Sequence, residues 1–243
     1  ARTIQEIRQS GKLLAATEGA FAPFNFFEGS KLTGFEVELA ELVARRMGLA
    51  IEWKTLGFDA LLTGLAQDRW DVVIASHGIT EARAKAVSFM APHYCSGGLI
   101  VTRDPKIRSA RDLAGKAVAV QTGTTYLENL RRLVAGSEVR NFPGDNDARA
   151  ALVTGRVQAW VTDRFVALEA LRRNPEPKLH AGELLFTERV AAAAALGNQG
   201  LVSAWNRALA DTLADAPEAC RLVADEARRV VAYFTDGVNA CAR

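Results

Sequence analysis

The chain has 243 residues, of which 49% are hydrophobic and 24% charged, so it can bury cores for two lobes of roughly 100 residues each. This composition excludes disordered, collagen-like and disulfide-dense chains. Thirty basic and 28 acidic residues leave a formal charge of +2, which is too small to hold nucleic acid or an anionic membrane. The longest apolar stretch, residues 190–196, is far shorter than the roughly 20 residues that cross a bilayer, so we expect no membrane span.

Predicted strands and helices alternate along the chain. Apolar or β-branched runs predict strands, and apolar residues at helical spacing predict helices. In chain order we expect a strand at 12–17, a helix at 35–47, a strand at 51–55, a short helix at 58–66, a strand at 70–75, strands at 99–102, 117–121 and 158–162, and helices at 124–135, 145–154 and 163–173. This alternation predicts an α/β protein with open, mostly parallel sheets flanked by helices.

Two stretches of small residues divide this series of elements. Residues 95–98 and 187–195 are interpreted as two hinge crossings between lobes. Residues 1–95 together with 195–243 would form lobe 1, and residues 98–187 would form lobe 2. The segment 198–232 is predicted to be helical, with a break at Pro217, and to return to lobe 1.

An arginine stands where a helix is expected to begin. Residues 74–83 read as a buried strand end, a Ser/Gly turn and a helix with Thr80 as N-cap, which places Arg83 in the first turn. The helix dipole disfavours a cation there, so an anion shared by Arg83 and backbone N–H groups would explain it. The alternative is an Arg83 that pairs with a surface acid such as Glu81 or Asp59.

Two further strand ends are candidate positions for a charged group of a ligand. Residues 120–125 read as a strand, a Gly/Thr turn and a helix, which is a second candidate position for an anion. Asp163 ends the strand at 158–162, at the edge where such sheets bind ligands, and is a candidate partner for an ammonium group. The alternative for Asp163 is a helix N-cap, and it can serve both roles.

Taken together, these stretches resemble the amino-acid-binding type of bacterial extracellular solute-binding protein, family 3, which supplies ABC importers. The resemblance spans nearly the whole chain. It rests on residues 20–24 (AFAPF), 32–40 (LTGFEVELA), 58–62 (FDALL), 71–83 (DVVIASHGITEAR), 112–124 (DLAGKAVAVQTGT) and 155–163 (GRVQAWVTD), in this order and spacing.

The resemblance implies a two-lobed periplasmic-binding-protein clamshell (type II) that closes on a free amino acid. Arg83 would bind the α-carboxylate together with N–H groups near Gly78 and Thr125, and Asp163 would bind the α-ammonium. By position, Phe21 and Phe58 match an aromatic pair around the ligand side chain, and Glu18 matches a specificity acid. Ala75, Ser76, Gln121 and Thr124 would supply further contacts.

The chain departs from the family pattern at three positions. Gly78 stands where a Ser or Thr usually contacts the ligand, so one hydroxyl is missing. His77 takes a commonly apolar place and is interpreted as a buried, hydrogen-bonded histidine that points away from the ligand. Gln158 replaces a usual Asp and is interpreted as structural. Phe24 and the four tryptophans are assigned to packing, and packing is also the alternative for Phe21 and Phe58.

The expected function is capture of a cationic or polar amino acid for a membrane permease, by a monomer in the periplasm or at the cell surface whose export signal has been removed. We expect no catalysis, metal, cofactor or nucleic-acid partner. Two alternatives remain: a dehydratase of cyclic acids on the same scaffold, with Asp163 or Glu18 as the acid, and a ligand-sensing domain of a membrane receptor. Export would also permit a disulfide between Cys220 and Cys241, which leaves Cys95 free.

Overall fold

The computed structural model describes residues 1–214, and these form two compact units. Within the described residues, unit 1 consists of Ala1–Gly19, Pro23–Cys95 and residues 189–214, and unit 2 consists of Ala20–Ala22 and Ser96–Glu188. The chain therefore passes between the units at Cys95 and at Glu188, and a short piece around Phe21 belongs to unit 2 although its neighbours in sequence belong to unit 1. No helix within residues 1–214 is long and apolar enough to cross a membrane.

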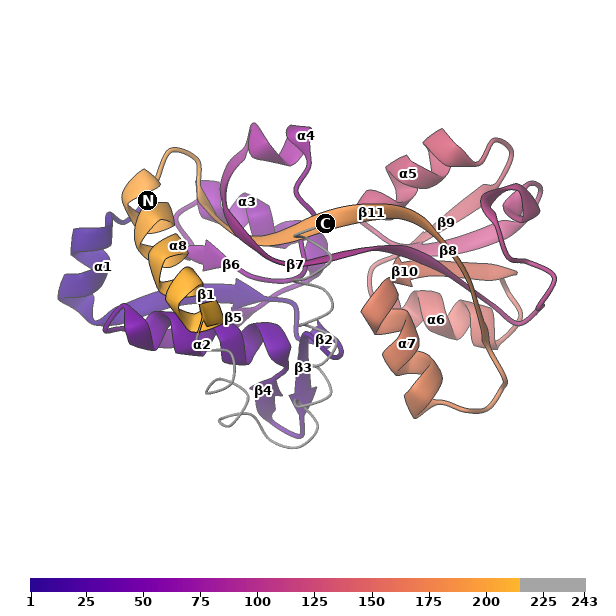
Figure 1. The fold of residues 1–243 in the computed structure, drawn as a ribbon, viewed down its shortest axis with the longest axis horizontal. Helices are drawn as coiled ribbons and strands as arrows, with labels where there is room; N and C mark the ends of the chain where they lie inside the picture. Colours follow the sequence, from indigo (N-terminus) through magenta and orange to yellow (C-terminus); the bar gives the residue numbers. More distant parts are fainter. Residues whose placement is uncertain (215–243) are drawn as a thin grey trace. The chain divides into compact units, whose positions relative to one another are not determined.

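Unit 1 is an α/β unit whose strands follow the order β5-β1-β6-β11 (Figure 1). Its helices are α1 (Ile4–Ser10), α2 (Phe35–Arg46), the 3-10 turn η1 (Phe58–Ala60), α3 (Leu61–Ala66), α4 (Glu81–Ala84) and α8 (Gln199–Ala214). Its strands are β1 (Lys12–Thr17), β3 (Asn25–Glu28), β4 (Lys31–Thr33), β5 (Ala50–Thr55), β6 (Val72–Val73) and parts of β7 (Val87–Thr102) and β11 (His180–Ala195). β1 is parallel to β5 and β6, whereas β11 is antiparallel to β6.

Unit 2 repeats this plan with the order β7-β10-β8-β9. Its remaining elements are β2 (Ala20–Phe21), η2 (Ala110–Leu113), β8 (Ala117–Gln121), α5 (Thr125–Leu133), β9 (Glu138–Phe142), α6 (Asp145–Val153), β10 (Ala159–Asp163) and α7 (Arg164–Arg173). β8 is parallel to β9 and β10, and β7 is antiparallel to β10. The prediction of an α/β protein with mostly parallel sheets is therefore confirmed.

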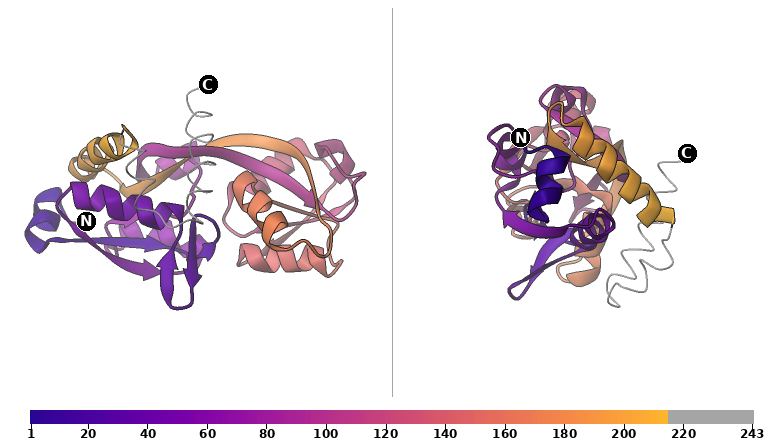
Figure 2. Two further views of the ribbon diagram at one scale, coloured as in Figure 1. Left: turned by 60° about the horizontal axis from the view of Figure 1, so that its bottom comes forward. Right: turned by 90° about the vertical axis from the view of Figure 1, so that its left-hand side faces the viewer.

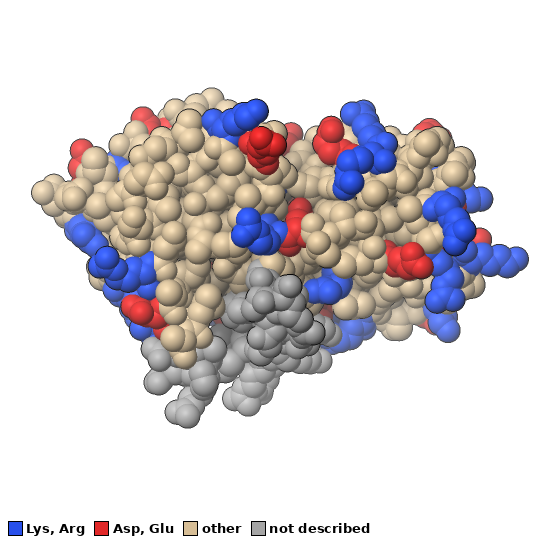
Figure 3. Space-filling model, turned by 45° about the horizontal axis from the view of Figure 1, so that its top comes forward, with Lys and Arg blue, Asp and Glu red and all other residues tan. Residues whose placement is uncertain are grey.

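Each unit has its own core. In unit 1 the helix α2 packs against α8, as the views in Figures 1 and 2 agree, and Trp70 and Trp205 are buried. In unit 2 the buried residues of β8 and β10 pack with Leu130 of α5, and Trp160 is buried as predicted. On the face seen in Figure 3, Lys and Arg are interspersed with Asp and Glu.

The two predicted crossing segments belong to long strands. Residues 95–98 lie inside the 16-residue strand β7, and residues 187–195 form the end of the 16-residue strand β11. Small residues are required there by contact, because a Cβ atom at Gly97 would lie 1.9 Å from the carbonyl oxygen of Phe186. The predicted helix 198–232 is present as α8 up to Ala214, and its remainder and the break at Pro217 lie outside the described residues.

Candidate functional site

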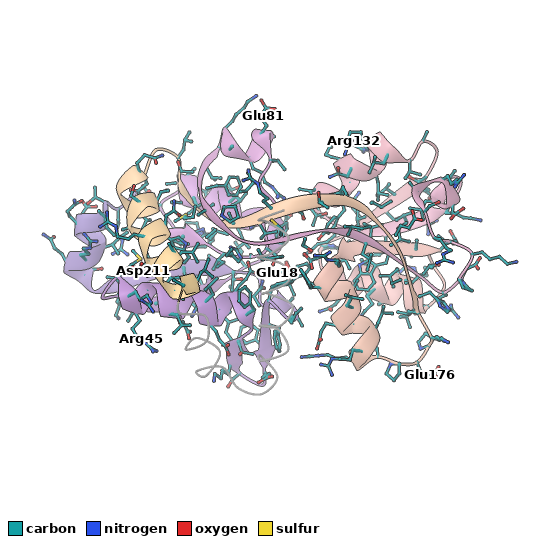
Figure 4. All side chains as sticks on the ribbon, in the orientation of Figure 1. Glu18, Arg45, Glu81, Arg132, Glu176 and Asp211 are labelled. Carbon is teal, nitrogen blue, oxygen red and sulfur yellow. The ribbon has the colours of Figure 1, made fainter. Side chains whose placement is uncertain are left out.

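Two loops of unit 1 carry the predicted ligand residues. Glu18 follows β1, and the segment Ala75–Arg83 follows β6 (Figure 4). Because β1 and β6 are parallel neighbours, their carboxyl ends lie at the same edge of the sheet, where such sheets bind ligands. The side chain of Ala75 lies in the core, so a ligand can meet only its backbone.

Arg83, Phe58 and His77 lie together in unit 1. Thr80 caps α4 by accepting a hydrogen bond from the backbone N–H of Arg83 at 3.1 Å, as predicted. The guanidinium group donates to the carbonyl oxygen of Gly78 at 2.8 Å, and its carbon lies 6.0 Å from the centre of the Phe58 ring. Phe58 in turn stacks on His77, with ring centres 4.3 Å apart.

His77 stays uncharged in this arrangement. Burial lowers the pKa of its imidazole well below the usual value, and the charge of Arg83 lowers it further. The predicted burial of His77 is confirmed, whereas the predicted hydrogen bond of its ring and its orientation away from the ligand stay predictions. The imidazole also supports Phe58, a role that strand alternation alone did not indicate.

A buried carboxylate, that of Glu36, organises the same loops and was missed by the sequence analysis. Glu36 is fully buried near the start of α2 and accepts hydrogen bonds from Asn25 and from both the backbone N–H and the hydroxyl of Ser76. It also contacts Nε2 of His93 at 2.7 Å. The Ser76 hydroxyl, predicted as a ligand contact, is therefore engaged by Glu36. A charged residue inside the apolar pattern of residues 32–40 was the available signal for this role.

In unit 2 the segment 120–125 forms the predicted strand, turn and helix start. Gln121 is buried and donates through Nε2 to the carbonyl oxygen of Pro143 at 3.3 Å, and the Thr124 hydroxyl donates to the carbonyl oxygen of Gln121 at 2.8 Å. The Thr125 hydroxyl donates to Glu188 at 2.8 Å. These three side chains have partners within the protein, and the backbone N–H groups at the start of α5 are further candidates for contact with an anion.

Asp163 is the N-cap of α7, as the alternative interpretation had it. Its Oδ1 accepts from the backbone N–H groups of Phe165 at 2.8 Å and Val166 at 3.2 Å, and the residue is 1% exposed. The cap fixes a buried carboxylate at the end of β10. This arrangement is compatible with a second role as the partner of an ammonium group.

The surroundings of Asp163 are acidic. The carboxyl groups of Asp163, Glu188 and Asp145 all raise the pKa of the Tyr126 phenol, after burial as the largest cause. Asp145 accepts from Trp160 Nε1 at 3.0 Å and from the Thr162 hydroxyl at 2.7 Å, and burial raises the pKa of its carboxyl to about 7. These residues were missed because Asp145 and Glu188 are far apart in sequence and only the fold brings them near Asp163. Phe21, which also belongs to unit 2, is 7% exposed.

The state of Cys95 differs from the prediction. Cys95 takes part in a disulfide, so the prediction that it is free is wrong. The predicted bridge between Cys220 and Cys241 lies outside the described residues, and in a chain with three cysteines it could not coexist with an intrachain bond of Cys95.

Gln158 is structural as predicted, because its side chain accepts from the N–H of Ala117 at 2.8 Å. No group of metal-ligating side chains suited to a metal ion occurs within residues 1–214.

Comparison with known proteins identifies the family. The model of the bacterial extracellular solute-binding proteins, family 3, matches residues 13–217. The chain belongs to this family. Among its relatives is the L-cystine-binding protein TcyJ of Escherichia coli K12, which is 34% identical over 87% of this chain and 81% of its own length.

Solved structures of amino-acid-binding proteins resemble the chain over most of its length. An ancestral arginine-binding protein bound to arginine is 35% identical, with a TM-score of 0.82 over 87% of this chain and 97% of its own. The ancestral amino acid-binding protein AncCDT-1, a precursor of cyclohexadienyl dehydratase, is 27% identical, with a TM-score of 0.82 over 90% of this chain and 97% of its own. The fold prediction and the resemblance drawn from the sequence are thus confirmed.

Proposed function

We propose that this protein captures a free amino acid and delivers it to the membrane permease of an ABC importer. The observation that carries the proposal is the family match over residues 13–217, joined to complementary charges at the sheet edges of the two units. Unit 1 presents Arg83, and unit 2 presents Asp163 with further acids around it. An amino acid carries a carboxylate and an ammonium group, and this pair of charges matches the two sets.

In this proposal Arg83 binds the α-carboxylate together with backbone N–H groups near Gly78 and Thr125. Asp163 binds the α-ammonium, which suits the negative potential created by its acidic neighbours in unit 2. Both charges of the ligand then have a partner that the protein already holds in place, since Thr80 caps the helix of Arg83 and α7 is capped by Asp163.

The side chain of the ligand is proposed to be cationic. Glu18 supplies a carboxylate, and Phe21 and Phe58 supply aromatic faces that attract a flat or cationic group. The stack of Phe58 on His77 and the nearby Arg83 guanidinium hold that ring in one orientation. Gly78, which lacks the hydroxyl usual in the family, leaves room for a longer side chain.

Calorimetry on protein freed of copurified ligand tests the proposal with L-arginine, L-glutamine, L-glutamate and L-cystine as probes. We expect arginine to bind more tightly than glutamine, and glutamine more tightly than glutamate. Glu18→Gln should weaken arginine binding most. A preference for glutamate or cystine, or unchanged arginine binding by Glu18→Gln, would contradict the cationic assignment.

Binding is proposed to occur without chemical change in the ligand, by an exported monomer. Mass spectrometry of the ligand recovered after long incubation tests the first point, and an altered ligand would favour a dehydratase-type activity instead. Size-exclusion chromatography with light scattering tests the second. Transport by cells that carry the permease, with and without this protein, distinguishes delivery to an importer from signalling to a membrane receptor.

A further inference from the structure

The carboxylate of Glu36 joins two separate loops of unit 1. Its Oε1 accepts from Asn25 Nδ2 at 3.1 Å and from the Ser76 hydroxyl at 2.7 Å. Its Oε2 accepts from the Ser76 backbone N–H at 2.9 Å and contacts His93 Nε2 at 2.7 Å. Glu36 and Asn25 are fully buried, and His93 is 2% exposed, so solvent does not compete for these bonds.

The first arm of this network reaches the loop after β1. The Oδ1 atom of Asn25 accepts from the backbone N–H of Gly19 at 2.8 Å, directly after Glu18. Gly19 has φ +82, and a Cβ atom there would lie 2.7 Å from the Phe27 ring, so the loop has little freedom to take another path. Glu36 therefore acts on the position of Glu18 through one intermediate side chain.

The second arm holds the loop after β6. Ser76 has φ +60, a left-handed conformation that a residue other than glycine rarely adopts. Two hydrogen bonds to Glu36 keep it there, and two residues later Gly78 accepts from the Arg83 guanidinium. The turn at Ser76 thus sets the direction in which the chain continues towards Arg83.

We propose that Glu36 is a positioning residue for ligand recognition, which locks the Glu18 loop and the Ser76–Arg83 loop to each other. The inference rests on the proposed function, in which Glu18 and Arg83 bind opposite ends of one amino acid. A fixed spacing between them means that neither loop has to be ordered when the ligand binds, which preserves affinity. The fixed spacing also determines how long the side chain of the ligand must be to reach Glu18 while the α-carboxylate of the ligand is bound to Arg83.

The variant Glu36→Gln separates the two arms. The Ser76 backbone N–H can only donate, so the amide oxygen of Gln is needed at the Oε2 position and the NH₂ group takes the Oε1 position. The Ser76 hydroxyl can reverse its role there, but Asn25 Nδ2 then faces another donor. Turning the Asn25 amide would remove its bond from the Gly19 N–H. The Gly19 arm is therefore the one that this variant breaks.

Hydrogen exchange at single amides, measured by NMR on ligand-free protein, tests the lock. In Glu36→Gln we expect at least tenfold faster exchange at Gly19 and a smaller change at Ser76. Asn25→Ala should have the same effect at Gly19 while leaving Ser76 protected, and it serves if Glu36→Gln does not fold. Unchanged exchange at Gly19 in both variants would overturn the lock whether or not an amino acid binds.

Calorimetry with L-arginine and L-glutamine then tests recognition. We expect Glu36→Gln to weaken arginine binding at least tenfold and to narrow the preference for arginine over glutamine. Asp71→Asn is the matched control, because Asp71 is another buried acid of unit 1, which accepts from the Leu14 N–H and from Arg2 and contacts neither loop. An equal loss in Asp71→Asn, or no loss in Glu36→Gln, would overturn the positioning role. Failure of the unmodified protein to bind any amino acid would instead contradict the proposed function.

Discussion

The carboxyl group of Asp145 lies in the interior of unit 2, where Trp160 and Thr162 donate to its two oxygens. Burial is the largest cause that raises its pKa to about 7, and the nearby Asp163 acts in the same direction. The pKa of an aspartate in the unfolded chain is about 4. Between pH 4 and pH 7, roughly, the folded protein therefore holds a proton on Asp145 that the unfolded chain has lost. The stability associated with this group is therefore lost as the pH rises from about 4 to 7.

The pH dependence of the free energy of unfolding should change when Asp145 is replaced. Relative to Asp145→Asn, the unmodified protein should lose about 3 kcal/mol of stability between pH 5 and pH 8. The asparagine keeps the bond from Trp160 and can donate to a reversed Thr162 hydroxyl, so the variant changes the titration more than the packing. Urea unfolding of both proteins at several pH values measures the difference. A difference that does not depend on pH would show that Asp145 is ionised throughout.

Among the elements, α3 packs more tightly than its sequence suggests. Trp70 donates from Nε1 to the carbonyl oxygen of Leu61 at 3.0 Å, which holds the indole against the helix. A Cβ atom at Gly64 would lie 2.1 Å from Cζ2 of that indole. The ring cannot retreat without losing its hydrogen bond, so glycine is required by contact here.

Gly64→Ala is expected to destabilise unit 1 by about 1–3 kcal/mol, because the added methyl group overpacks the core. Gly57→Ala is the matched control, since its Cβ atom would meet only Asp59 Oδ1 at 3.5 Å and its φ of −53° suits any residue. Denaturant unfolding followed by tryptophan fluorescence compares the two. Equal stability of both variants would mean that Trp70 can move away from α3.

The strand β7 carries the disulfide of Cys95, at the last residue that belongs to unit 1 before the chain enters unit 2. Peptide mapping under non-reducing conditions should therefore recover the Cys95 peptide joined to a second cysteine peptide. Reduction should lower the free energy of unfolding by about 2–5 kcal/mol, because the bond restricts the unfolded chain. Recovery of an alkylated Cys95 peptide without prior reduction would contradict the bond.

At the scale of the whole molecule, the proposed ligand contacts come from both units. Arg83 belongs to unit 1 and Asp163 to unit 2, so removal of either charge should weaken arginine binding although the other unit is intact. We expect Arg83→Ala and Asp163→Asn each to cost about 2–5 kcal/mol of binding free energy, since each leaves a ligand charge without its partner. Asn in place of Asp163 keeps the acceptor that caps α7, and the variant should stay folded.

Glu81→Ala is the control for both variants, because Glu81 is exposed on α4 and points outwards in Figure 4. Arg164, the direct neighbour of Asp163 in the chain, does not serve as a control. Its Nε atom is buried, and its guanidinium group lies 4.7 Å from the centre of the Phe165 ring. Calorimetry in which Glu81→Ala weakens binding as much as the charge removals would show that the ligand lies elsewhere.

Local sequence patterns determined much of this protein. The helical spacing of apolar residues in α2 and the caps at Thr80 and Asp163 depend on neighbours in the chain, and their predictions agree with the structure. The strand predicted at 70–75 is present only as β6, Val72–Val73. The order and spacing of the motifs also sufficed for the family. β9 and the β3–β4 hairpin were missed, because their strands are short and partly exposed and lack a clear apolar alternation.

Other features were decided only by the tertiary structure. Residues 191–195 are all alanine, which does not favour a strand, and they became one because Ala193 and Ala194 pair with β6. Asp145 is an unremarkable acid in the sequence, and Glu36 is marked there only by its place inside an apolar pattern. Their roles arise because the folded units bury each carboxylate beside donors from distant segments, and a hydrogen bond between such segments leaves no periodic trace in the chain.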